Sequence, residues 1–597
     1  MATTLGERVK QTRVTPFFLV VVALLLPVGA VLISMIGSHW HAVADYVFEV
    51  INIDDVGTSD TPVVGAYSRF GFDHPGPLLW WVLAPFHWIA GNTGILFGTG
   101  VLNGAAIVGS VFVARRRGGV AFSVVIAVII LLLLQGMGTD LLIDPWNPWI
   151  PVLPFLAYVL LAWSIAERDF AMLPWLVGVG SFVVQSHIGY LPLVLGLAVV
   201  AAVLARTHHD AVEPGALKRW AKVSGIVAIA CWIAPVVQQF TGNPGNLGEI
   251  FEYFRDPKES ALGWAWAFRV MGTELGFPGA WVTGEDTGPT GLVDDSGSGF
   301  LALIVLAVAA GLAAVAWRRG ERRAARFSVF AVCGAMFGLI AGSRVTGITG
   351  PYVVRWWFVL AAMVYASIAW SAWSMTANWW RAQSTGIVRA GRIAIGILVG
   401  VFSLVTAVNA VPARVPVEDV SEVIGGLRPQ LVEALSRDDS YLVTWIDART
   451  LGDAGTGVFL ALREEGFDAH LRQAHAKTVG GDRAAEPEDV DAVVLVVSDY
   501  SLLDGWQVPV GAIEIAHYDP LSAEERTRVE ELSDELRAQL DEPLPAGPLP
   551  VESEDRRNIL VKAGADRDLV DDLWNLQKHA GQTVYLVAPE VIGTTGA

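Results

Sequence analysis

Long apolar runs with few charges are the feature that most restricts how this chain can fold. Eleven such runs come close to the roughly 20 residues that a helix needs to cross a bilayer. They cover residues 16–38, 93–114, 118–139, 148–166, 170–187, 188–205, 222–240, 299–316, 327–343, 352–375 and 393–411. The runs predict an α-helical membrane protein that crosses the bilayer many times. A charged fraction of 17% agrees with this, because soluble chains usually carry about 25%.

The distribution of positive charge predicts how the chain is oriented. Basic clusters occur at residues 8–13, 115–117, 206–222, 318–326 and 381–392, whereas the alternate loops, such as 45–73 and 249–295, are rich in acid. Lys and Arg collect on the cytoplasmic side of membrane proteins. Eleven spans with a cytoplasmic N-terminus place every cluster in the cytoplasm and the C-terminal region outside the cell membrane. The first run is too long for a signal peptide, so we expect it to be retained.

One short apolar segment near residues 76–91 does not fit this pattern of spans. It contains Trp80, Trp81 and Trp88, which suit the depth of the lipid headgroups. We interpret it as a juxtamembrane helix that lies in the membrane interface. The alternative is a true span, which would invert the topology of everything that follows.

The charge balance predicts two domains, a transmembrane domain over residues 1–411 and a soluble domain over residues 412–597. From Pro412 onward there are 36 acidic and 16 basic residues, whereas the first 411 residues hold 23 acidic and 25 basic residues. Strand patterns at 441–446, 492–497 and 583–588 and an amphipathic helix at 522–540 predict an α/β fold. Residues 452–457 lack the dinucleotide-binding spacing, so we interpret them as a turn and a helix start. The acidic charge excludes a nucleic-acid partner.

The first predicted outer loop holds the strongest candidates for catalysis. Asp54 and Asp55 are adjacent, and Asp60 follows shortly after them. A carboxylate at the mouth of a span can accept a proton from a hydroxyl nucleophile in a transition state. The same groups could hold a divalent cation against a diphosphate. The alternative is that they are simply solvated acids of an outer loop.

Two short motifs contain histidines that could bind substrate. His74 opens the sequence His-Pro-Gly-Pro, and His187 and Tyr190 lie in Gln-Ser-His-Ile-Gly-Tyr between two predicted spans. His74 could donate a hydrogen bond to a phosphate or a sugar, or it could only mark the start of a helix. Ionisable groups at membrane depth are usually functional, although a structural role fits His187 equally well.

Arginines are scarce in the predicted outer loops. Arg344 and Arg355 flank the short loop 345–354, so both could converge on one phosphate as bidentate donors. Arg69, in the first loop, is a weaker candidate for the same role. The alternative is that these side chains extend to lipid headgroups.

Acidic residues soon after the first span, the His74-Pro75-Gly76-Pro77 helix start and the Gln185 to Tyr190 motif resemble the GT-C superfamily of membrane glycosyltransferases. The resemblance covers about the first 410 residues. It implies a polyprenyl-phosphate sugar as donor and an acidic catalytic residue in the first outer loop, which would be Asp55 or Asp54. Gly76 departs from the His-Pro-Pro form of some branches, so the branch stays open.

These features together predict an enzyme of a bacterial cell envelope that transfers a hexosyl or pentosyl group to an envelope glycan or lipid. The general base would be Asp55 or Asp54, and the carboxylates are expected to share a pocket with the scarce arginines. The substrate-binding residues would be His74, Arg69, Asp60, His187, Tyr190, Arg344 and Arg355. A transporter of lipid-linked saccharides would need charges near the bilayer midplane. A non-catalytic envelope scaffold is the second alternative.

Overall fold

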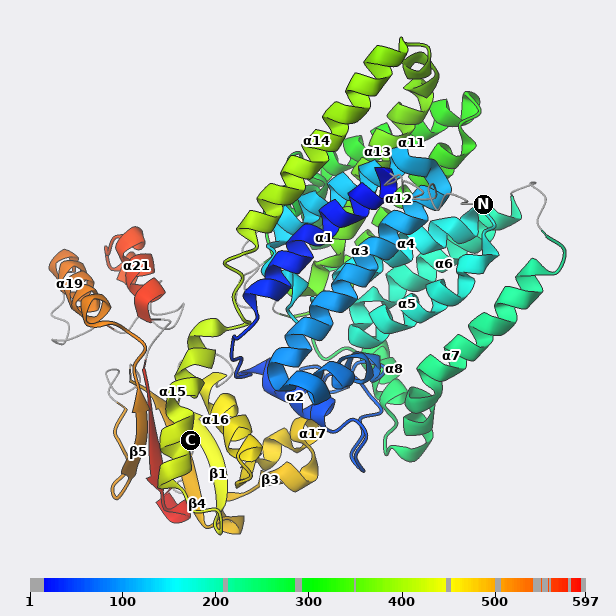
Figure 1. Cartoon of the computed structure of the whole chain (residues 1–597). Helices are drawn as coiled ribbons and strands as arrows, with labels where there is room; N and C mark the ends of the chain where they lie inside the picture. Colours follow the sequence, from blue (N-terminus) through cyan, green and yellow to red (C-terminus); the bar gives the residue numbers. More distant parts are fainter. Residues whose placement is uncertain are drawn as a thin grey trace, which may run out of the picture. The chain divides into compact units, whose positions relative to one another are not determined.

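The computed structural model describes residues 16–207, 213–284, 293–347, 350–446, 453–499, 506–540, 549, 557, 560–577 and 581–591 (Figure 1). The chain divides into two compact units. The first comprises Met1–Ile36, Val63–Leu83 and Leu96–Ala413, and the second comprises Gly37–Pro62, Ala84–Ile95 and Arg414–Ala597. The sequence predicts one boundary near residue 411, with everything before it in the first domain. By packing, however, two N-terminal segments also belong to the second unit. The basic cluster at 8–13 lies outside the described residues.

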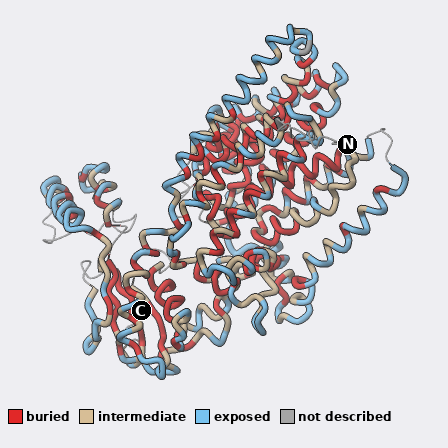
Figure 2. Tube along the Cα trace, in the orientation of Figure 1, coloured by how far each residue is buried: buried red, intermediate tan, exposed pale blue. Residues whose placement is uncertain are grey.

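The first unit is built from apolar helices, as expected where lipid cannot satisfy backbone polar groups. Figure 2 shows buried residues concentrated inside this helical unit, with α7 and α14 largely exposed. In lipid such exposed apolar surface would face hydrocarbon. The long helices are α1 (Pro16–Ser34), α3 (Leu78–Met137), α4 (Val152–Ala166), α5 (Leu173–Ser186), α6 (Leu191–Arg206), α7 (Ala216–Thr241), α11 (Gly299–Arg318), α12 (Arg322–Gly342), α13 (Trp356–Arg381) and α14 (Thr385–Asn409).

Helix α3 contains three of the segments that the sequence predicts to be separate. Its 60 residues would extend about 90 Å as one straight helix, far more than the roughly 30 Å hydrocarbon core. Gly91 and Gly119 have φ angles of +58° and +68°, which an α-helix cannot contain. The chain therefore turns at both glycines, close to the predicted ends of the juxtamembrane helix and of the span at 93–114. Placement of the first segment in the membrane interface stays a prediction.

All the predicted spans fall on helices of the structure. Eight helices in the described residues are long and apolar enough to cross a membrane, and α3 counts once among them. Two further predicted spans correspond to the shorter apolar helices α4 and α5. The protein is a multi-pass membrane protein by these helices, and the total of eleven crossings stays a prediction.

Short helices fill the segment between α7 and α11. They are α8 (Asn246–Arg255), α9 (Gly263–Leu275) and α10 (Ala280–Thr283). Ile250 of α8 packs with Phe72 and Ile188 in a small hydrophobic cluster. Asn246, at the start of α8, exchanges two hydrogen bonds with the backbone of Asp73. These contacts fix the loop that carries His74 against α8 and against Ile188, which follows α5.

The second unit contains a six-stranded sheet of order β3-β2-β1-β4-β6-β5. Strands β1 to β4 run parallel to one another, and β6 runs antiparallel to both β4 and β5. This confirms the predicted α/β class, and β1, β4 and β6 lie where the strand patterns predict them. The strands are β1 (Ser440–Ile446), β2 (Asp468–Arg472), β3 (Ala484–Ala485), β4 (Ala492–Ser498), β5 (Ile513–Tyr518) and β6 (Gln582–Val587).

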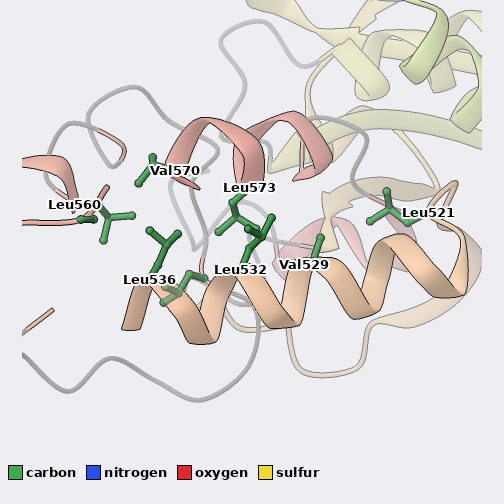
Figure 3. Packing of buried hydrophobic residues seen from close by; sticks show 9 residues of the cluster. Leu521, Val529, Leu532, Leu536, Leu560, Val570 and Leu573 are labelled. Carbon is green, nitrogen blue, oxygen red and sulfur yellow. The ribbon is translucent and has the colours of Figure 1, made fainter. Parts of the chain in front are cut away.

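Helices α15 (Glu418–Ala434), α16 (Asp453–Glu464) and α17 (Ala476–Val479) accompany the sheet. The predicted helix start at 452–457 is confirmed where α16 begins at Asp453, and residue 452 lies outside the described part. Between β5 and β6, helices α19 (Ala523–Gln539) and α21 (Arg567–Gln577) pack on each other around a separate hydrophobic core (Figure 3). Leu532, Leu536 and Leu573 are fully buried in it.

The segment that follows α1 packs on this α/β unit. Helix α2 (Asp45–Asp54) contacts α16 and α17. The backbone N–H of Ala44 donates to Thr456 Oγ1 at 2.9 Å, and Trp40 Nε1 donates to the carbonyl of Pro416 at 3.1 Å. Gly457 lets the segment approach, because a Cβ there would lie 2.8 Å from Val43. Helix α2 thereby presents the candidate carboxylates at its C-terminal end.

Candidate functional site

Asp54 is the last residue of α2, and its carboxylate is the more accessible of the adjacent pair. Its side chain is 73% exposed, and Oδ1 lies 3.2 Å from Nε2 of His87. An ionised carboxylate can only accept, so His87 Nε2 carries the proton of this hydrogen bond. The bond from His87 lowers the pKa of Asp54, although partial burial opposes the effect. Asp54 is therefore ionised at neutral pH and free to accept further hydrogen bonds.

Asp55 is held much more tightly, by an arginine of the C-terminal domain. Arg483 donates from one terminal nitrogen to Oδ1 at 2.6 Å and from the other to Oδ2 at 2.9 Å. The two side chains are only 14% and 13% exposed. Burial alone would lower the pKa of Arg483, but the hydrogen bonds and charge of Asp55 raise it. Asp60 attracts the same guanidinium, so one cation serves at least two carboxylates of the loop.

The sequence suggested that these carboxylates could hold a divalent cation. Their arrangement in the structure adds no support for this role. Within the described part of the chain, no three His, Cys, Asp or Glu side chains are grouped so that they could hold a metal ion. The carboxylates instead take their positive partners from the protein. These partners are His87 and Arg483.

In the membrane unit, His74 and His187 form a pair whose tautomers are fixed by the backbone. Their ring centroids lie 4.8 Å apart. Nδ1 of His74 accepts the N–H of Ile188 at 3.2 Å, and Nδ1 of His187 accepts the N–H of Gly189 at 3.3 Å. Each neutral ring must then carry its proton on Nε2. Burial and the nearby His187 lower the pKa of His74 well below its ordinary value, so His74 is a neutral donor.

The two motifs that contain these histidines pack directly on each other. Gln185 accepts the N–H of Leu78 at 3.4 Å and donates to the carbonyl of Cys231 at 2.7 Å, which ties the loop to α5 and α7. Gly76 is required here, because a Cβ would meet the Gln185 side chain and lie 2.7 Å from Pro235. A proline at residue 76 would carry such a Cβ and would therefore clash with Gln185 and Pro235.

Arg355 is a buried cation next to this histidine pair. Its side chain is 1% exposed and lies over the rings of Trp149 and Phe358, at 4.9 and 4.3 Å from their centroids. It interacts electrostatically with Tyr190, whose ring centroid is 6.2 Å from that of His187. The Tyr190 hydroxyl is buried, and in the described part of the chain it has no hydrogen-bond partner. Buried hydroxyls are usually paired, so this one is available to a ligand.

The other two predicted arginines have different surroundings. Arg344 is exposed, in contrast to Arg355, although both flank the same loop. Arg69 lies over the ring of Phe70, with its guanidinium carbon 4.9 Å from the centroid. One Arg69 nitrogen is 3.4 Å from where a Cβ of Gly347 would lie, so Arg69 borders the loop that follows Arg344.

Basic residues gather at the other ends of the helices in the membrane unit. Arg116 and Arg117, which lie just before the turn at Gly119, both donate to Asp169 between α4 and α5. Arg326 of α12 forms a buried ion pair with Glu167 at 3.3 Å. The clusters at 115–117 and 318–326 therefore lie at one end of this unit, as the predicted topology requires. Which side of the membrane that end faces stays a prediction.

The predicted site residues thus fall into two groups, one in each unit. Asp54, Asp55 and Asp60 belong to the second unit, and the histidines, Tyr190 and the arginines belong to the first. The shared pocket expected from the sequence stays a prediction. Sequence reasoning missed His87 and Arg483. His87 lies in an apolar segment that we interpreted only as interfacial, and Arg483 contacts a residue 428 positions away.

No protein-family model matches the chain, and no curated protein matches it by sequence. Among solved structures it resembles ArnT from Cupriavidus metallidurans in the apo state, with a TM-score of 0.52 and 14% identity over 83% of this chain and 96% of that chain. ArnT bound to undecaprenyl phosphate gives a TM-score of 0.49 at 14% identity, covering 83% and 95%. The Archaeoglobus fulgidus oligosaccharyltransferase gives 0.41 at 10% identity, covering 95% and 88%.

The helical unit and its soluble α/β partner define a multi-pass membrane protein with an attached C-terminal domain. The chain shares its fold with ArnT from Cupriavidus metallidurans. The resemblance to the GT-C superfamily that was stated from the sequence is therefore confirmed at the level of the fold.

Proposed function

We propose that this protein is a membrane glycosyltransferase that moves a sugar from a polyprenyl-phosphate donor to an envelope glycan or lipid. The observation that carries the proposal is the buried group of Arg355, Tyr190, His74 and His187 in a unit with the GT-C fold. It offers a cation and several neutral donors at the ends of apolar helices. Binding of a lipid-linked phosphate requires a cation and hydrogen-bond donors, placed at the ends of helices that cross the membrane.

In this proposal, Arg355 stabilises the negative charge on the phosphate as the bond to the sugar breaks. A guanidinium is suited to the task because it can bind two phosphate oxygens at once. Tyr190 and the Nε2–H groups of the histidines add hydrogen bonds without adding charge. Arg344, which is exposed, would attract the donor rather than hold it.

The carboxylates of the second unit provide the acid–base chemistry. Both oxygens of Asp55 are occupied by Arg483, so Asp54 is the better proton acceptor of the two. It would take the proton of the acceptor hydroxyl as that oxygen attacks the anomeric carbon. The bond from this carbon to the phosphate oxygen breaks in the same step, so the anomeric configuration inverts. Asp55 would remain an ionised neighbour that orients the loop.

The direct test is sugar transfer by the purified full-length protein in lipid nanodiscs. The probes are labelled polyprenyl-phosphate sugars, with envelope lipid or glycan extracts as acceptors. We expect Asp54→Asn and Asp55→Asn each to reduce transfer strongly. Arg355→Lys should weaken donor use by about 10-fold or more, since a bidentate contact is lost, and Arg344→Lys should change it little.

Three results would contradict the proposal. Wild-type protein that consumes no donor would favour the envelope scaffold. If Asp54→Asn and Asp55→Asn both transfer sugar as fast as the wild type, the carboxylates have no role in the mechanism. Movement of intact lipid-linked saccharide between leaflets, without transfer, would favour the transporter.

A further inference from the structure

The C-terminal domain contributes one side chain to the loop that carries the candidate carboxylates. Arg483 ends a short turn directly before β3, and the same compact unit contains Asp55. Its two terminal nitrogens bind the two oxygens of Asp55, and one of them also donates to the carbonyl of Val479 at 2.9 Å. The guanidinium is therefore held in position from both sides.

A bidentate contact of this kind restricts a carboxylate more than a single hydrogen bond does. The planar guanidinium fixes both the position and the plane of the Asp55 carboxylate, whereas a lysine could only act as a point charge. The low exposure of both side chains means that water cannot easily take over this role. Because Asp54 directly precedes Asp55 in the chain, the same contact also restricts the backbone position of Asp54.

Arg483 also balances the negative charge of the loop. It attracts Asp55 and Asp60, and its charge also acts on Asp54. The three carboxylates lie within seven residues of sequence and would repel one another without a cation. His87 pairs with Asp54, whereas Arg483 acts on all three carboxylates, so removal of His87 would leave Asp55 and Asp60 compensated.

We propose that Arg483 is a positioning residue for sugar transfer, through which the C-terminal domain completes the catalytic loop. The inference rests on the proposed function, and it gives this domain a role in the reaction rather than only in binding partners. Arg483 does not contact the reacting atoms. It acts by holding Asp55 and, through the backbone, Asp54 in the geometry that transfer requires.

The experiment compares Arg483→Ala and Arg483→Lys in the full-length protein in nanodiscs, with Arg428→Ala as the matched control. Arg428 belongs to the same domain and pairs at 2.8 Å each with Glu464 and Glu465, neither of which belongs to the carboxylate loop. We expect Arg483→Ala to lower kcat by about 100-fold, the size of effect seen when a catalytic group is misplaced by about 1 Å. The KM for the donor should change by less than about 3-fold, because phosphate binding is assigned to other residues.

Guanidinium ions added to the assay provide a readout that a purely structural role would not move. In Arg483→Ala they can occupy the vacated position beside Asp55, so we expect them to restore kcat by about 10-fold. They should not raise the kcat of the wild type or of Arg428→Ala. Arg483→Lys keeps the charge and loses the bidentate contact, so an intermediate kcat is expected.

The outcomes separate this inference from the proposed function. No transfer by the wild type refutes the proposed function and the inference that rests on it. An active wild type with unchanged kcat in Arg483→Ala refutes only the inference. If Arg483→Ala does not fold, as judged by circular dichroism and size exclusion, Arg483→Lys decides. A wild-type kcat in a folded Arg483→Lys overturns the inference, and a reduced kcat with unchanged KM supports it.

Discussion

Replacement of Gly76 by alanine should destabilise the membrane unit considerably. The new methyl group would meet the side chain of Gln185 and lie 2.7 Å from Pro235 Cγ. Overpacking of this kind costs about 1–3 kcal/mol. Gln185 can only yield by giving up its hydrogen bonds to Leu78 and Cys231, each of which contributes about 1 kcal/mol. The expected loss of stability is therefore about 3–5 kcal/mol.

Gly109→Ala is the matched control for this change. Gly109 belongs to α3, the helix that begins shortly after Gly76, and a Cβ there would meet nothing within 4 Å. Alanine is favoured over glycine within a helix by about 0.5–1 kcal/mol. This variant should therefore be slightly more stable than the wild type. The two substitutions add the same methyl group and should have opposite signs.

The assay is thermal or denaturant unfolding of the purified protein in nanodiscs, followed by tryptophan fluorescence. A Gly76→Ala variant as stable as the wild type would refute the reasoning, and so would equal destabilisation by both variants. The double variant Gly76→Ala/Gln185→Ala tests the cause. Because the shorter side chain relieves the clash, its loss of stability should be smaller than the sum of the two single losses.

Three further predictions concern the ion pair, the acid–base loop and the buried hydroxyl. Glu167→Ala leaves Arg326 buried without its partner and should cost about 3–5 kcal/mol in the same unfolding assay, whereas Glu167→Leu/Arg326→Met should recover most of this loss. His87→Phe removes the hydrogen bond that lowers the pKa of Asp54, so this pKa should rise. Because the ionised form is active, the acidic limb of the kcat/KM profile should move to higher pH than in the wild type. An acidic limb that does not move would contradict the role of Asp54. Tyr190→Phe removes a buried hydroxyl that has no hydrogen-bond partner among the described residues, so stability should be kept or increased while the KM for the polyprenyl-phosphate donor rises by about 10-fold or more. A donor KM that does not change would show that the hydroxyl makes no contact with the ligand.

The helices could be predicted because a segment in lipid must be apolar along its full length, and this pattern is visible in the sequence alone. The turn at Gly119 is also visible, since it closely follows the three arginines at 115–117 that separate two apolar runs. No Asp, Glu, Lys or Arg marks the turn at Gly91 in the same way. The strands β1 and β4 were found because parallel strands buried on both faces are continuous apolar runs. β2, by contrast, contains Asp468, His470 and Arg472 and gives no such signal.

The candidate site was harder to predict, because the residues that contact the carboxylates are distant from them in sequence. The carboxylates stand out as an adjacent pair, but nothing in the C-terminal domain marks Arg483 among its other arginines. Arg344 and Arg355 look equivalent as loop-flanking residues. Only the packing of Trp149 and Phe358 around Arg355 distinguishes them.

The connection between β5 and β6 has a consequence for how this domain can vary. Tyr518 and Gln582 are partners in the sheet, so the two ends of the connection already lie as close together as the ends of a tight hairpin. Helices α19 and α21 enclose their own core and supply no strand to the sheet (Figure 3). A two-residue turn in place of residues 519–581 would preserve every strand pairing. The helical pair is thus a removable module, whose sequence can change without disturbing the strand pairings around it.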